Sequence, residues 1–77
     1  MRLTRRDRVL VGGQFRKMAE VRVLLDGAEQ ADVVSFDREN GFVERVLKDD
    51  KGKVVIDRRN GEMAIEVLRG VVTVEAR

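Results

Sequence analysis

Turns that contain glycine recur at short intervals along most of the chain. From residue 27 to residue 70, the glycines of these turns are 9 to 14 residues apart. The turns are Asp26-Gly27, Asn40-Gly41, Lys51-Gly52, Asn60-Gly61 and Arg69-Gly70. The segments between them are rich in valine and isoleucine, which favour strands, and glycine supplies the positive φ that tight hairpin turns need. The pattern predicts a mainly β fold, an antiparallel meander of five or six short strands that forms a curled sheet or a small barrel.

Residues 8–20 admit two interpretations. The stretch 14–20 contains good helix formers and no β-branched residue, which predicts one short helix near residues 14–20. In the alternative, residues 8–11 form a strand and Gly12-Gly13 is the turn of a hairpin. A stretch this short has too little periodicity to decide between the two structures.

Several of the expected strands have apolar residues on both faces, whereas a sheet with one wet face would alternate apolar and polar residues more cleanly. Apolar residues on both faces indicate a curled sheet, a covering helix or a partner subunit. The residues on the second apolar face are Leu24, Val43, Leu47, Val55 and Leu68. They are the candidates for a protein interface, and an ordinary barrel interior is the alternative.

Positive charge is concentrated at the start of the chain. Residues 1–17 contain six basic side chains against one acidic side chain, a net charge of +5, while the rest of the chain has ten basic against thirteen acidic side chains, or −3. The basic residues are Arg2, Arg5, Arg6, Arg8, Arg16 and Lys17. We expect residues 1–12 to form a basic, flexible N-terminal arm and residues 13–77 to form a single β-rich domain. Such an arm could bind a polyanion through these six side chains, or it could be a loose, solubilising terminus.

The composition excludes several kinds of chemistry. The chain has no His and no Cys, which removes imidazole bases, thiolate nucleophiles and the common zinc sites. The acidic residues near Gly41 and Gly52 lack the spacing of a calcium loop and are better explained as turn residues. We therefore expect no catalytic residue, no metal, no cofactor and no small-molecule substrate. No apolar run is long enough to span a membrane, and the expected location is the cytoplasm.

Residues 21–75 resemble small β-rich proteins of phages and prophages. The resemblance rests on Val-Arg-Val-Leu-Leu-Asp-Gly at 21–27, Asp-Val-Val at 32–34, Gly-Phe-Val-Glu-Arg at 41–45, Asp-Asp-Lys-Gly-Lys-Val-Val at 49–55, and Glu66-x-x-x-Gly70-x-Val72-x-Val74. It implies an accessory or virion-assembly protein found in the host cytoplasm or in the virion. It transfers no functional residue.

These observations favour a non-enzymatic interaction or assembly protein that binds a protein partner or a second copy of itself. Association would use strand edges or an apolar face. The alternative is a small β-barrel that binds nucleic acid through the basic N-terminal arm. For that alternative, Phe36 and Phe42 are the conceivable stacking residues, although their apolar neighbours favour a place in the core.

Overall fold

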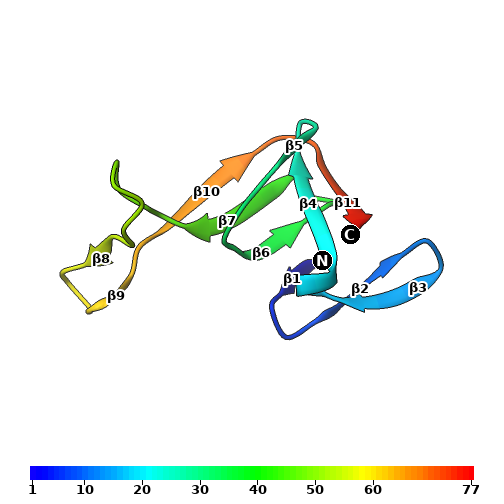
Figure 1. Cartoon of the computed structure of the whole chain (residues 1–77), viewed down its shortest axis with the longest axis horizontal. Coiled ribbons are helices and arrows are strands. Elements are labelled where there is room, and N and C mark those ends of the chain that lie inside the picture. Colours follow the sequence, from blue (N-terminus) through cyan, green and yellow to red (C-terminus); the bar gives the residue numbers. More distant parts are fainter.

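The computed structural model describes the whole chain, residues 1–77, and its regular elements are almost all strands (Figure 1). The larger sheet has four antiparallel strands in the order β1-β6-β7-β10. These strands are β1 (Arg2–Thr4), β6 (Val33–Asp37), β7 (Phe42–Val46) and β10 (Ile65–Arg69). The outer edge of the sheet is β1 on one side and β10 on the other.

A second sheet has three antiparallel strands in the order β11-β4-β5, which are β11 (Val72–Ala76), β4 (Val21–Leu25) and β5 (Ala28–Glu29). The remaining strands form two separate hairpins. One pairs β2 (Arg8–Val11) with β3 (Gln14–Lys17), and the other pairs β8 (Ile56–Asp57) with β9 (Glu62–Met63). The predicted mainly β, antiparallel fold is confirmed. Both sheets keep free edge strands, so neither closes into a barrel.

The hairpin interpretation of residues 8–20 is the one the structure shows. Gly12 and Gly13 have φ values of 59° and 79°, and Val11 lies opposite Gln14. Two consecutive positive φ values define the two-residue turn that matches the twist of a hairpin, and glycine adopts them without strain. The helix expected near residues 14–20 is reduced to a single 3₁₀ turn, η1 (Met18–Glu20).

Two turns are built from the same local sequence, Asp-Arg-x-Asn-Gly, at residues 37–41 and 57–61. In each, the glycine N–H donates to the carbonyl oxygen of the aspartate, at 3.0 Å in the first turn and 2.8 Å in the second. In each, the aspartate side chain also accepts the backbone N–H two residues further on, at 2.9 Å. Short polar side chains stabilise turns in this way, and here they close the β6–β7 and β8–β9 connections.

The hydrophobic core is small and draws on both sheets. Its six buried residues are Val9, Val21, Val23, Phe36, Val43 and Val72. They come from β2, β4, β6, β7 and β11, so the core joins the two sheets to each other and to the β2–β3 hairpin. Phe36 has no exposed surface, which places it in the core rather than on a binding surface.

The first twelve residues do not form the separate arm that we expected. β1 pairs with β6 along three residues, and Val9 of β2 is 0% exposed. The physical reason is visible in the sequence: Leu3 follows Arg2, and Val9 and Val11 alternate with Arg8 and Leu10, so one apolar face of each short strand can be buried while the arginines stay outside. The folded domain therefore begins with β1.

The molecule is elongated, with extents of 42 × 24 × 23 Å, and the two hairpins lie at opposite ends of its long axis (Figure 1). The β8–β9 hairpin is joined to the sheet by a ring of three backbone hydrogen bonds. Leu47 donates to Ala64 at 2.9 Å, Ala64 donates to Val55 at 2.8 Å, and Val55 donates to Leu47 at 3.0 Å. No residue between Val46 and Val72 is buried, so this end of the molecule lies outside the core.

Candidate functional site

Five large apolar side chains at the β8–β9 end are left open to solvent, between 39% and 52% exposed. We call this group the apolar arm surface; its residues are Val54, Ile56, Met63, Ile65 and Val67. Ile56 and Met63 are direct partners in the β8–β9 register, and direct partners in an antiparallel pair point to the same face. Ile65 and Val67 lie at the two-residue spacing of one face of β10. Large apolar side chains exposed on neighbouring strands in this way are typical of an interaction surface.

The predicted interface residues are less exposed than the apolar arm surface. Val43 is fully buried in the core, and Leu24, Leu47, Val55 and Leu68 are half-buried. None of the five is among the exposed large apolar residues. The sequence indicated correctly that both faces are apolar, but it gave no means of deciding which face the core would use. No barrel closes, and of the five residues only Val43 belongs to the buried core, so an interface role for Leu24, Leu47, Val55 and Leu68 stays a prediction. The exposed face of β10 is the one that contains Ile65 and Val67.

The six basic residues of the N-terminal segment do not gather into one patch. Arg2 pairs with Glu44 at 3.2 Å, and the Nε of Arg5 donates to the carbonyl oxygen of Val33 at 3.4 Å. Arg16 is the register partner of Val9 and so points to the core side of the hairpin. Its Nε is buried without a hydrogen-bond partner. Of the other three, Arg6 lies exposed in the β1–β2 turn.

Arg8 and Lys17, the remaining two, lie opposite each other on the outer face of the β2–β3 hairpin. The next pair on this face is Leu10 opposite Phe15, and the side chain of Phe15 is left largely uncovered. We call these four residues the hairpin face. Phe15 was not predicted as a surface aromatic, because the sequence left its segment open between a short helix and the second strand of a hairpin. The available signal was its alternation with Gln14 and Arg16 after the glycine turn.

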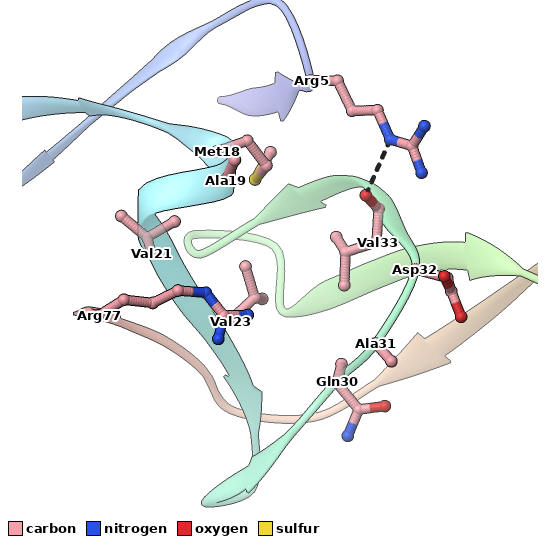
Figure 2. Close-up of a pocket in the computed structure, with 10 residues that line it drawn as sticks. All are labelled: Arg5, Met18, Ala19, Val21, Val23, Gln30, Ala31, Asp32, Val33 and Arg77. Atoms are coloured by element: carbon pink, nitrogen blue, oxygen red, sulfur yellow. Dashed lines mark hydrogen bonds between the residues drawn. The ribbon is translucent and has the colours of Figure 1, made fainter.

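A cleft of about 480 Å³ separates β4 and η1 from the β5–β6 connection (Figure 2). Its apolar lining includes Val21, Val23 and Val33, and Arg5 and Arg77 lie on opposite sides of it. The acidic side chain in the lining is that of Asp32, which pairs with Lys48 at 2.8 Å. The hydrogen bond from Lys48 holds the pKa of Asp32 below its usual value. This carboxylate therefore stays ionised and is a poor proton donor.

Asp37 is the other carboxyl group with a perturbed pKa. Its side chain accepts the backbone N–H and the side-chain amide of Asn40, at 2.9 and 2.7 Å, and the N-terminal ammonium lies 3.4 Å away. These contacts, led by the backbone N–H of Asn40, lower the pKa of Asp37 from 3.8 to about 2. The group closes the β6–β7 turn and fastens the chain terminus to it, which is a structural role.

Ser35, the one serine of the chain, is also used structurally. It is fully buried on β6, and its Oγ donates to Glu44 Oε1 at 2.7 Å. The same carboxylate pairs with Arg2 at 3.2 Å, so Ser35, Glu44 and Arg2 form one connected set of polar contacts between β6, β7 and β1. Across the whole chain, no three acidic side chains come together in a group that could hold a metal ion.

Comparisons of the chain with protein-family models, with curated proteins and with solved structures found no match. None of the structure's helical segments has the length and the apolar character that crossing a bilayer requires. The apolar arm surface and the hairpin face lie at opposite ends of the molecule (Figure 1).

Proposed function

We propose that this chain is a non-enzymatic assembly protein that associates with a second copy of itself through the apolar arm surface and the free edge of β10. The observation that carries the proposal is the exposed run of large apolar side chains on β8, β9 and β10. The resemblance of residues 21–75 to small phage and prophage proteins implies the same class of function, an accessory or virion-assembly role. No catalytic step is part of the proposal.

The exposed surface area of the chain is larger than that of a compact monomer of its mass, which supports association with a second copy. The chain exposes 5603 Å², whereas surface scaling gives about 4,800 Å² for a compact monomer of this mass. The excess of roughly 800 Å² is close to what one partner contributes to a protein interface of standard size. A second copy that covers the apolar arm surface would remove much of this excess from water.

The geometry of β10 suits a symmetric contact. β10 is an edge strand, so half of its backbone N–H and C=O groups face outward, ready to pair with another strand. If two copies of β10 pair antiparallel about Val67, Ile65 of one copy lies opposite Arg69 of the other, and Glu66 lies opposite Leu68. This register brings no like charges together.

The charge of the same end of the molecule also favours self-association. Residues 48–62 contain five basic and four acidic side chains, so their net charge is +1. Two copies that approach through this end meet little electrostatic repulsion. The same approach through residues 5–17, with five basic and one acidic side chain, would bring two segments of charge +4 together.

The test is the solution mass of the chain across a wide range of concentration, by sedimentation or by chromatography with light scattering. We expect a reversible dimer that Val67→Lys dissociates, because the new charge must be buried at the centre of the contact. Val71→Lys is the matched control, since Val71 is exposed in the turn between β10 and β11 and lies outside the proposed contact. A monomer at every concentration would overturn the proposal, and so would equal dissociation by both substitutions.

A further inference from the structure

The outer face of the β2–β3 hairpin is not needed to hold the hairpin in place. Register partners share a face, so Val9 and Arg16 point inward together with Val11 and Gln14. Val9 is completely buried in the core, and this contact fixes the hairpin. The opposite face presents Leu10 and Phe15 to solvent. Phe15 is 67% exposed, so burial gives no structural reason for an aromatic ring at this position.

Three basic side chains that form no ion pair lie near the Phe15 ring. Arg8 and Lys17 occupy the next register pair on the same face. Arg38, from the β6–β7 turn, lines a hollow of about 230 Å³ together with Phe15, Leu10 and Arg8. None of the three cations forms an ion pair within the chain. The acidic side chain of the hollow, Glu39, lies 3.5 Å from the N-terminal ammonium, which it shares with Asp37.

An aromatic ring bordered by unpaired cations fits one ligand class better than others. Proteins that bind single-stranded nucleic acid combine a positively charged surface along the backbone with aromatic side chains on which bases stack. In a duplex the bases are already stacked and paired, so a single protruding ring has nothing to stack on. A protein partner that bound mainly by apolar contact would not require the surrounding cations.

We propose that the hairpin face binds single-stranded nucleic acid. Phe15 stacks on an unpaired base, and Arg8, Lys17 and Arg38 contact the neighbouring phosphates. Leu10 supports the ring from the adjacent strand. The contacts are made to phosphates and to the flat face of a base, so binding is tolerant of sequence and weakens with salt. This site lies at the opposite end of the molecule from the self-association surface and does not depend on it.

The contribution of the Phe15 ring to binding is tested by fluorescence anisotropy, with the full-length chain and a fluorescein-labelled oligothymidylate. Phe15→Leu keeps an apolar side chain and removes the aromatic ring, and we expect it to weaken binding by roughly tenfold. Phe15→Tyr keeps the ring and is expected to bind as the unchanged protein does. Because the side chain is exposed, both variants should keep the β spectrum of the original by circular dichroism. Equal affinity of the Leu and Tyr variants would overturn the proposal.

The contribution of the cations is tested by measuring how oligothymidylate binding depends on salt concentration. The slope of log affinity against log salt is about −0.7 for each phosphate contacted on a single strand. We expect Arg8→Ala to reduce its magnitude by about that amount. Arg59→Ala removes the same charge from the other hairpin, where the side chain is 93% exposed, and should leave the slope unchanged. Equal effects of the two substitutions would contradict the proposal, as would tighter binding to a duplex or to heparin, which has no bases.

One further experiment distinguishes the nucleic-acid site on the hairpin face from the self-association surface. Val67→Lys, which is expected to dissociate the dimer, should still bind the oligothymidylate, and Phe15→Leu should still form the dimer. Either proposal can then fail without the other. Loss of oligonucleotide binding in Val67→Lys would contradict a site confined to the hairpin face.

Discussion

The two hairpins at the ends of this molecule are attached to it in different ways. The β2–β3 hairpin has two four-residue strands joined by Gly12-Gly13, and Val9 anchors it in the core. The β8–β9 hairpin has two-residue strands and no buried residue, and a ring of backbone hydrogen bonds attaches it. One hairpin therefore depends on side-chain packing and leaves a charged outer face free. The other depends on backbone geometry and leaves apolar side chains free.

Truncating one apolar side chain in each hairpin should show the largest difference. Val9→Ala removes buried methyl groups from a core of six residues, and we expect the free energy of unfolding to fall by about 2 kcal/mol. Ile56→Ala removes a larger side chain from the other hairpin, where it is half-exposed, and should change stability by no more than about 0.5 kcal/mol. Urea denaturation of the two variants at a concentration where both are monomeric measures this. Equal losses would mean that the β8–β9 end has a packed interior after all.

The repeated Asp-Arg-x-Asn-Gly turns allow a second, matched comparison. Gly41 and Gly61 have nearly the same φ, 69° and 71°. A Cβ on Gly61 meets nothing, whereas a Cβ on Gly41 would lie 2.7 Å from the carbonyl oxygen of Gly70. Gly61→Ala should cost about 1 kcal/mol for the left-handed backbone alone, and Gly41→Ala should cost clearly more because the β10–β11 turn must also shift. Thermal unfolding of the pair checks the order, and the reverse order would contradict the close approach of these turns.

A further expected effect is on pH dependence and concerns the first of these turns. The pKa of Asp37 falls from 3.8 to about 2 on folding, so the folded state binds its proton less readily than the unfolded state. Its contribution to stability is complete above the unfolded value and is lost as the pH falls from about 4 toward 2. Asp37→Asn should flatten the stability profile in that window. An unchanged profile in the variant, or an Asp37 carboxyl that titrates near 3.8 by NMR, would show that the turn does not hold the ionised form.

The sequence predicted much of this architecture because turns are local. Asp26-Gly27, Asn40-Gly41 and Asn60-Gly61 each end a strand as expected, and the β-branched segments between them form the strands. The recurrence of Asp-Arg-x-Asn-Gly was a signal that the sequence analysis did not use. It would have predicted that the β6–β7 and β8–β9 turns share one geometry.

What the sequence did not predict depends on contacts between distant segments. The pairing of β1 with β6 and of β11 with β4 joins strands far apart in the chain, and no local pattern reports such pairs. The pairing of β1 with β6 places residues 1–12 in the folded domain. The two pairings together decide which face of the sheets is buried. Phe15 is an example. Its sequence neighbours are compatible with a helix, but the glycine turn and the burial of Val9 place it in a strand.

The most direct test of the whole account is amide hydrogen exchange of the two hairpins as a function of protein concentration. If a second copy pairs with the free edge of β10, the outward amides of that strand gain protection as the concentration rises, while those of β2 and β3 do not change. The gain should vanish in Val67→Lys. Exchange from β10 that is independent of concentration, or protection that rises at the β2–β3 hairpin instead, would contradict the division of roles between the two ends.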